Sequence, residues 1–339
     1  MELVEKPFKP EVSYVLVSCC TCKRPKMLYE ALKSVEEMIL PQDIKVEILV
    51  CDNDPEESAK QTVEEFSQNS KYTVHYVVEK ERGIAPARNR VLKEAVTLNV
   101  SHILCFDDDE ILEKNCLVEH INMYKTNEKA YISSGPAYNT FKENCPKYIQ
   151  NSIIFKQSTT KKTGLERNTC ATNNVFFPLN LVKDFDIYFS TEYKFMGGED
   201  GDFFGRATKK GFTIIWNKEA VVYEMVTEAR GNLKYIFEKS YYNGYSSALL
   251  KSKDEKFIKK RKLNIFSYTL ITIFYALMVI PSILLGLSIF FNCISQFLKA
   301  KGKLVATLKN KPIDFYKNIY GEWKTRHSEH MRRISLVFN

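Results

Sequence analysis

Two groups of acidic residues have the spacing that chemistry on a sugar or a phosphate would need. The first group is three aspartates, 107–109, which directly follow the apolar stretch 103–106. In an extended backbone Asp107 and Asp109 face one way and Asp108 faces the other. Two carboxylates on one side suit Mg²⁺ or Mn²⁺ holding a diphosphate, and a cation would also relieve the repulsion of adjacent like charges. The alternative is a solvated acidic turn.

The second group follows a pair of glycines. Gly197 and Gly198 precede Glu199, Asp200 and Asp202, and the glycines give the backbone freedom to enter a helix. A helix N-terminus favours negative charge, so helix capping alone would explain Asp200 or Asp202. A carboxylate fixed at such a junction can also accept a proton from a sugar hydroxyl. Capping and catalysis are both compatible with this pattern.

Alternating strands and helices are expected to position the first group. Apolar runs rich in β-branched residues alternate with helical patterns, and short connections join them. The expected strands are 12–19, 44–51, 73–78 and 102–106, and the expected helices are 28–39, 56–67 and 85–98. This alternation predicts an α/β fold with a parallel sheet covered on both faces. Polar residues follow three of the strands, and ligands bind beyond the carboxyl ends of such sheets, so we expect a site there.

Composition and cysteine usage narrow the class of protein. The chain has 339 residues, of which 45% are hydrophobic, and this excludes a disordered, collagen-like or disulfide-framework protein. Its nine cysteines are scattered, and residues 1–11 contain no apolar core of a signal peptide, so we expect reduced thiols in the cytosol. Cys19, Cys20 and Cys22 have no second ligand pair at zinc spacing, so we interpret them as the end of a buried strand.

The basic charge is concentrated in the C-terminal region. Residues 251–339 contain 17 Lys and Arg against 5 Asp and Glu, whereas the whole chain has a net charge of +8. A basic tail on a slightly acidic body indicates an anionic partner, either nucleic acid or anionic lipid. Residues 265–298 contain no charged side chain, and this favours the membrane.

The form of membrane attachment stays open in the sequence. The apolar run is long enough to span a bilayer, but Pro281 lies in its middle and predicts a kink or break there. Lysines flank the run on both sides, at 256–262 and 299–303, and positive charge favours the cytoplasmic side. We therefore expect a re-entrant or interfacial hairpin with both ends cytoplasmic. One tilted span and a buried soluble helical pair are the alternatives.

Five ordered blocks between residues 12 and 250 resemble the family 2 glycosyltransferases, which are nucleotide-sugar enzymes of the GT-A fold. The blocks are Ser18-Cys19-Cys20-Thr21-Cys22-Lys23-Arg24-Pro25, Val50-Cys51-Asp52-Asn53-Asp54-Pro55, Gly83-Ile84-Ala85-Pro86-Ala87-Arg88-Asn89-Arg90, Phe106-Asp107-Asp108-Asp109-Glu110 and Gly198-Glu199-Asp200-Gly201-Asp202-Phe203-Phe204. The stretch 216–224 is most similar to the bacterial subgroup that builds succinoglycan-type exopolysaccharide units. The resemblance implies a Rossmann-like GT-A domain at 1–250 and a basic C-terminal region at 251–339 with a membrane segment at 265–298.

The resemblance also implies roles for individual residues. The nucleotide-sugar would contact Thr21, Arg24, Asp52, Arg88, Asp107 and Asp108, with Asp52 on a uracil-type base. Asp109, with Asp107 and Glu224, would hold Mg²⁺ or Mn²⁺. Asp200 would be the general base and Glu199 would orient a substrate. Many relatives have a histidine near Glu224, so a surface-strand glutamate is the alternative there.

The implied function is transfer of one sugar with inversion, from a nucleotide-sugar such as a UDP-sugar to a lipid-linked glycan. The Gln-x-x-Arg-Trp motif of processive synthases is absent. The expected place is the cytoplasmic side of the cell inner membrane, with no nucleic-acid partner. The alternatives are a GT-A-fold nucleotidyltransferase and a non-catalytic membrane scaffold that binds nucleotide-sugar or glycan.

Aromatic residues recur on an expected helix after the second acidic group. They are Tyr235, Phe237, Tyr241, Tyr242 and Tyr245. Aromatic residues at helical spacing are typical of a core, and stacking on sugars or contact with the membrane interface are the alternatives.

Overall fold

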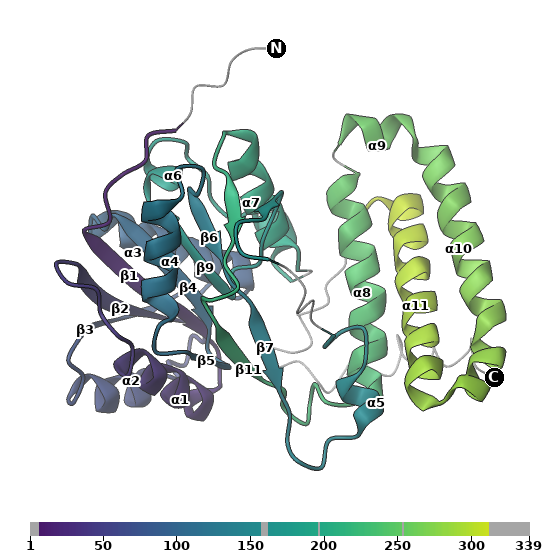
Figure 1. Ribbon diagram of the computed structural model, residues 1–339, viewed down its shortest axis with the longest axis horizontal. Coiled ribbons are helices and arrows are strands. Elements are labelled where there is room, and N and C mark those ends of the chain that lie inside the picture. The colour runs from purple at the N-terminus through teal and green to yellow at the C-terminus, as the bar shows by residue number, and fades with distance from the viewer. Residues whose placement is uncertain (1–6, 157–161, 196, 253, 312–339) are drawn as a thin grey trace.

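Two structural units lie side by side in the protein (Figure 1). The computed structural model describes residues 7–156, 162–195, 197–252 and 254–311. The first unit is an α/β structure that ends with strand β11, and the second is the helical unit α8–α11. The residues 304–339 that follow the apolar run are described only as far as 311.

The α/β unit is built on an eight-stranded sheet with the order β3-β2-β1-β4-β9-β6-β10-β8. Its strands are β1 (Tyr14–Thr21), β2 (Lys45–Asp52), β3 (Thr73–Val78), β4 (His102–Asp107), β6 (Ile132–Ser134), β8 (Glu166–Arg167), β9 (Asn174–Pro178) and β10 (Ile214–Trp216). The first four strands pair in parallel, as the sequence predicts. Strand β9 pairs antiparallel with both β4 and β6.

Helices cover both faces of this sheet, and this confirms the expected layers. The helices of the unit are α1 (Pro25–Glu36), α2 (Lys60–Ser67), α3 (Ile84–Thr97), α4 (Cys116–Thr126), α6 (Asn180–Lys183) and α7 (Glu199–Lys209), with a short 3₁₀ turn at Thr191–Tyr193. The short helix α5 (Lys147–Gln150) lies instead beside α8 and α11 (Figure 1). One buried core joins α1, α2 and α4 to the sheet, and a second core joins α3, α6 and α7 to its other face. The expected helix at 28–39 begins and ends three residues earlier, because Pro25 occupies its first turn.

A small second sheet continues from the acidic triplet. Its strands are β5 (Glu110–Leu112), β7 (Ala137–Thr140) and β11 (Val222–Met225), with β11 in the centre. Because β5 begins at Glu110, the triplet lies in the turn between the two sheets. This turn fixes the directions of its three side chains.

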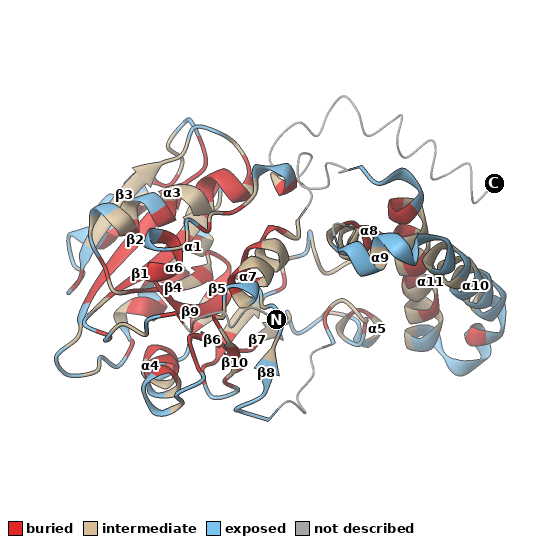
Figure 2. Cartoon of the chain, turned by 90° about the horizontal axis from the view of Figure 1, so that it is seen from above, coloured by how far each residue is buried: buried red, intermediate tan, exposed pale blue. Residues whose placement is uncertain are grey.

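The helical unit consists of α8 (Leu233–Lys251), α9 (Glu255–Lys259), α10 (Arg261–Ser282) and α11 (Leu287–Lys309). Helix α11 lies between α8 and α10 and packs on both (Figures 1 and 2). The expected break at Pro281 is wrong: α10 continues through this residue, and the chain reverses after the 3₁₀ turn Ile283–Leu285. The reversal requires a backbone φ of 98°, which Gly286 adopts without strain.

Candidate active site

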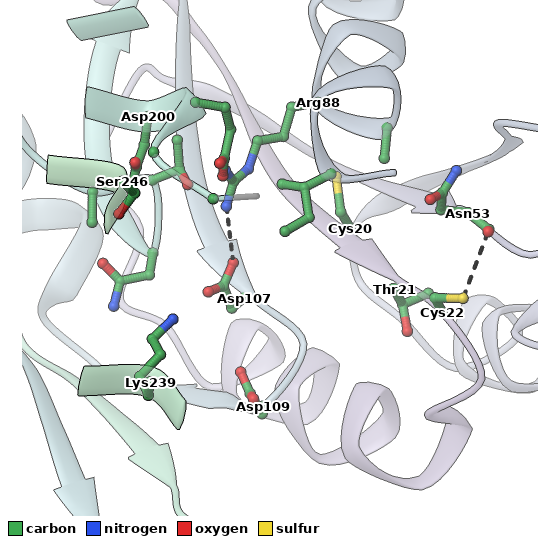
Figure 3. Close-up of a pocket in the computed structure, with 18 of the residues that line it drawn as sticks. Cys20, Thr21, Cys22, Asn53, Arg88, Asp107, Asp109, Asp200, Lys239 and Ser246 are labelled. Atoms are coloured by element: carbon green, nitrogen blue, oxygen red, sulfur yellow. Dashed lines mark hydrogen bonds and ion pairs between the residues drawn. The ribbon is translucent and has the colours of Figure 1, made fainter. Parts of the chain in front are cut away.

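A cavity of about 380 Å³ lies beyond the carboxyl ends of β1 and β4, and α8 closes its opposite side (Figure 3). Each surrounding element contributes one or more polar side chains to the wall. The wall includes Thr21 at the end of β1 with Cys22 and Arg24 after it, Arg88 from α3, Asp107 at the end of β4 with Asp109 after it, Glu199 and Asp200 from α7, Arg230 from the turn before α8, and Lys239, Tyr242, Asn243 and Ser246 from α8. The predicted edge of the sheet is therefore the place of the cavity.

The three aspartates alternate as the sequence predicts. Asp107 and Asp109 line the cavity, whereas the side chain of Asp108 is fully buried behind it. Asp108 accepts a hydrogen bond of 2.6 Å from the Thr21 hydroxyl and forms an ion pair of 2.6 Å with Arg24. Burial raises the pKa of Asp108 to about 7, although Arg24 opposes the rise. Asp108 therefore fixes the loop after β1, and its predicted contact with the nucleotide-sugar stays a prediction.

Two arginines hold the carboxylate of Asp109. Its Oδ2 atom lies 3.1 Å from Arg24 and 2.9 Å from Arg230. Arg230 also lies 2.6 Å from a carboxylate oxygen of Glu224 on β11. Burial raises the pKa of Glu224, with Arg230 opposing the rise. Arg230 thus connects the two carboxylates that the family resemblance associates with a metal.

The acidic residues fit a metal that is shared with a substrate. In the described part of the chain, no three His, Cys, Asp or Glu side chains are arranged to hold a metal ion. Mg²⁺ is commonly bound through one or two carboxylates together with the phosphates of a substrate. Asp107 and Asp109 provide two such carboxylates on the cavity wall. This donor set suits a divalent cation that binds together with a diphosphate.

The second acidic group lies at the start of α7, where the sequence places it. Gly197 and Gly198 have φ angles of 77° and 100°, so the chain turns sharply before Glu199. The buried Glu199 carboxylate pairs with Arg88, and burial raises the pKa of Glu199 while Arg88 opposes the rise. Asp200 lies on the cavity wall, and one of its oxygens accepts a hydrogen bond of 2.7 Å from the backbone of Gly201. The carboxylate is therefore fixed in place.

Arg88 connects the two acidic groups. Besides its contact with Glu199, its guanidinium lies 3.8 Å from Asp107 (Figure 3). The first group follows β4 and the second opens α7, so Arg88 sets the separation of residues that are about ninety positions apart in the chain. Its predicted contact with the nucleotide is untested, but its position between the carboxylates explains why an arginine is needed here.

Asp52 lies outside the cavity wall. Its buried carboxylate accepts hydrogen bonds from the backbone of Asp54 (3.0 Å) and Ala59 (2.7 Å) and from the Tyr76 hydroxyl (2.9 Å). Asp52 therefore shapes the loop after β2, and its predicted contact with a base stays a prediction. The neighbouring Asn53 does line the cavity, together with Cys22.

The wall formed by α8 was missed in the sequence. Lys239, Asn243 and Ser246 are four and three residues apart, so they share one face of the helix. This polar stripe was a readable signal, but the aromatic residues between its members obscured it. Of those aromatics, Tyr245 belongs to the core, as expected, whereas Tyr242 lines the cavity, and its stacking on a sugar stays a prediction.

Comparison with known proteins identifies the family. A model of glycosyl transferase family 2 matches residues 15–185, half of the chain. The chain belongs to this family. It is therefore a glycosyltransferase, which decides against the nucleotidyltransferase and scaffold alternatives.

Individual relatives agree with this assignment. The succinoglycan biosynthesis protein ExoM of Rhizobium meliloti (strain 1021) is 27% identical over 241 residues, which are 71% of this chain and 76% of ExoM. Residues 1–349 of S. aureus TarS, solved with UDP, superpose with a TM-score of 0.51 at 17% identity, covering 86% of this chain and 90% of that one. This chain spans 43% of a longer TarS chain.

A third structure supports the same fold. The mannosyltransferase PcManGT from Pyrobaculum calidifontis, solved with GDP-Man and Mn²⁺, has a TM-score of 0.57 at 15% identity. The match covers 89% of this chain and 91% of that protein. Together with the family match, these structures confirm the expected GT-A fold.

Proposed function

We propose that this glycosyltransferase moves one sugar, with inversion, from a UDP-sugar to a lipid-linked glycan during exopolysaccharide synthesis. The observation that carries the proposal is that Asp107, Asp109 and Asp200 line one cavity from two different elements. The ExoM relative supports the pathway, and the UDP complex of TarS supports the donor class. PcManGT was solved with GDP-Man, so the choice of UDP rests on the family resemblance through Asp52.

Asp200 is the proposed general base. It takes the proton of an acceptor hydroxyl, whose oxygen attacks the anomeric carbon while the bond from that carbon to the diphosphate oxygen breaks. Such a base contributes about 10²–10⁴ in rate. Attack opposite the leaving group converts an α-linked donor into a β-linked product. Glu199 and Arg88 position the start of α7, and with it Asp200.

The donor diphosphate binds at the other end of the cavity in this proposal. Asp107 and Asp109, with Glu224 behind Arg230, would hold Mg²⁺ or Mn²⁺, and the bound ion supplies positive charge to a leaving diphosphate. Four basic residues on the wall face four acidic ones: Arg24, Arg88, Arg230 and Lys239 against Asp107, Asp109, Glu199 and Asp200. The wall is thus balanced in charge. Because the charges of a diphosphate and a divalent cation largely cancel, the two can bind together with little change in the net charge of the site. Thr21 and Arg24 lie where the nucleotide would contact the loop after β1.

Helix α8 provides the acceptor side of the cavity. Tyr242, Asn243 and Ser246 offer an aromatic ring, an amide and a hydroxyl, which are groups that bind sugars. Ser246 packs against Gly198, since a Cβ added to that glycine would lie 3.7 Å from the serine Cβ. These residues are thus next to the proposed base. The domain boundary proposed at residue 250 falls at the end of α8. This helix forms part of the cavity wall and also packs against α11 in the helical unit.

The acceptor is proposed to be lipid-linked because one helix among the described residues is apolar enough and long enough to cross a membrane. This segment covers Arg261–Leu285 and has a mean hydropathy of 2.1 over its best window, of which only 6% is buried. The basic residues beside it support attachment to the cytoplasmic face of the inner membrane. A nucleic-acid partner is not proposed.

A donor screen tests the function. Detergent-solubilised protein is incubated with UDP-, GDP- and dTDP-sugars, with Mg²⁺ or Mn²⁺ or with EDTA, and release of nucleoside diphosphate is followed. Metal-dependent turnover of a UDP-sugar is the expected result. Metal-dependent nucleotide binding without turnover would indicate that the lipid acceptor is missing. Absence of both would contradict the proposed carboxylate roles.

A further inference from the structure

The outward face of α10 is an unbroken apolar stripe. Its residues recur every three or four positions, and each side chain is at least half exposed: Leu263, Phe266, Leu270, Ile273, Leu277, Ile280 and Leu284. Exposure rises toward the reversal of the chain and reaches 90% at Leu284. Figure 2 shows this exposed side of α10 facing away from the rest of the protein.

Two polar residues of α10, Tyr268 and Ser282, lie on its other side. Tyr268 is half-buried and lies under the ammonium of Lys303 on α11, and Ser282 is buried. The Thr269 and Thr272 hydroxyls donate to carbonyls of their own helix, so their polarity is satisfied internally. A helix on the surface of a water-soluble protein turns its apolar face inward. Helix α10 has the opposite arrangement, which is typical of a helix in contact with lipid.

Positive charge surrounds one end of the stripe. The cations are exposed and stand at the end of α9 and the start of α10: Lys256, Lys259, Lys260, Arg261 and Lys262. Ile258 is 56% exposed among them. An apolar face beside clustered lysines complements the acyl chains and anionic headgroups of a bilayer. This charge pattern favours a membrane over a second protein as the occupant.

The packing behind α10 determines its orientation. Gly244 on α8 and Gly302 on α11 bring these helices into backbone contact, since an added Cβ would overlap the carbonyl oxygens of Lys299 and Tyr241, respectively. A crossing α10 would therefore carry α11 and α8 into the hydrocarbon with it. That would bury several lysines of α11 and one wall of the active site in lipid, where charged groups are costly.

We propose that α10 lies flat in the interface of an anionic membrane, through its outward stripe, and does not cross the bilayer. If the proposed function is taken together with this orientation, the orientation also sets how far the acceptor must extend from the membrane. This step rests on the proposed function. The cavity lies beyond α11 and α8, and because packed helix axes are 8–10 Å apart, α8 is roughly 20 Å from α10. The acceptor hydroxyl must extend that far from the lipid. A lipid-linked oligosaccharide meets this requirement, whereas a lipid phosphate without sugars does not.

Flotation tests the docking surface. The full chain is mixed with phosphatidylcholine vesicles with or without phosphatidylglycerol and separated on a density gradient. The protein is expected to float with the anionic vesicles. The double variant L277Q/L284Q should reduce the bound fraction about tenfold or more, because two apolar side chains are lost from the contact. The control I39Q changes a residue of the α/β unit that is 51% exposed, and it should bind like the parent.

Protease protection tests the orientation. A recognition site for a site-specific protease is inserted after Gly286, and the variant is added outside sealed anionic vesicles. A flat helix leaves the site outside, so the protease cuts it without detergent. Protection until detergent is added would show a crossing helix and overturn the proposal.

Two further outcomes would also overturn it. One is failure of the chain to bind anionic vesicles. The other is a dimer in light scattering that dissociates in L277Q/L284Q, because the stripe would then be an interface between copies. Binding of UDP is measured in parallel, so a protein that docks and is cut but never transfers sugar contradicts the proposed function alone.

Discussion

The two units of the protein differ in where they place their large apolar side chains: the α/β unit buries them in its core, whereas the helical unit exposes them on the outward face of α10. In the α/β unit Leu16, Ile48 and Phe176 are fully buried, and polar groups gather at one edge of the sheet. In the helical unit the residues buried in α11 are small or polar, and the large apolar side chains of α10 point outward. The hydrophobic effect explains both arrangements if the two units have different surroundings. This difference is what the proposed membrane contact of the helical unit would require.

Helix α8 belongs to both arrangements. One face presents Lys239, Asn243 and Ser246 to the cavity, and another packs Gly244 against α11. The comparison therefore predicts that changes on one face of α8 alter catalysis and changes on the other alter docking and stability. Likewise, substitutions at the cavity in the α/β unit should alter catalysis, and substitutions in the helical unit should alter docking and stability.

The largest effect is expected for D200N in the α/β unit. Asparagine keeps the size of the side chain but cannot accept a proton, so turnover should fall by about 10²–10⁴. Binding of UDP with Mn²⁺, measured by calorimetry, should stay within twofold of the parent, and so should vesicle binding.

The matched control for this variant is D202N on the same helix. Asp202 pairs with Arg206 at 2.9 Å and lies away from the cavity wall, so turnover should be nearly unchanged. Equal losses in both variants would indicate a structural role for the acidic start of α7. Full activity of D200N would exclude Asp200 as the base.

Acidification should weaken the α/β unit through His120. This ring is buried, with contacts of 2.8 Å to Ser133 and Asn174, and burial lowers its pKa to about 4. The unfolded chain takes up the proton near pH 6.5, so the stability from the neutral ring is present above that pH and is lost as the pH falls toward 4. Between pH 7.5 and pH 5 the loss is about 2 kcal/mol.

Comparison with H120Q isolates this contribution from other titrating groups. The variant should be less stable at pH 7.5, yet its free energy of unfolding should fall by about 2 kcal/mol less on acidification. Residues 233–311 contain no histidine, so hydrogen exchange in α8 and α11 should not follow this transition. Parallel pH profiles of parent and H120Q would contradict the assignment.

A smaller effect is expected from G244A, which acts on the helical unit. The new methyl group would overlap the Lys299 carbonyl, and such overpacking costs about 1–3 kcal/mol. Hydrogen exchange in α8 and α11 should accelerate while β1 and β4 are unaffected. The control G205A adds the same methyl to α7 in open space and should be neutral or stabilising by up to about 1 kcal/mol. Equal losses would show that the contact between α8 and α11 does not limit stability.

The sequence predicts the elements whose residues are close in the chain. Apolar β-branched runs mark β1 to β4, and the side-chain alternation within 107–109 separates Asp108 from its neighbours, as the structure confirms. The glycine pair before Glu199 predicts the start of α7 correctly. The break expected at Pro281 is wrong because α10 continues to Ser282, and the chain reverses instead at Gly286, which adopts the positive φ that the reversal requires.

Long-range packing determines the part of the site that the sequence does not reveal. Arg230 reaches Asp109 only because β11 pairs with β5 beside the triplet. Asp52 follows a strand as predicted, but the loop after it folds back and encloses the carboxylate, which no local pattern indicates. The polar stripe of α8 is visible as spacing, yet its direction depends on Gly244 and its contact with α11.

The smallest expected effect separates two adjacent serines of α8. Ser246 lines the cavity beside Gly198, whereas Ser247 lies outside the wall. Each hydroxyl donates to the carbonyl three residues earlier, so the pair differs in position and not in local bonding. Loss of one hydrogen bond to an acceptor sugar costs about 0.5–1.5 kcal/mol, which is roughly a two- to thirteenfold loss of kcat/KM. S246A should show this loss with lipid-linked glycans extracted from native membranes, and S247A should not.

Binding of UDP and hydrolysis of the donor provide the internal control for the comparison of S246A with S247A. Both variants should bind UDP and hydrolyse the donor at the parental rate in the absence of glycan, because Ser246 faces the base rather than the diphosphate in the proposed arrangement. A loss of donor hydrolysis in S246A would move this serine to the donor end of the cavity. Equal loss of transfer in S246A and S247A would mean that α8 acts through its stability alone, and the acceptor wall would then have to be sought on another element.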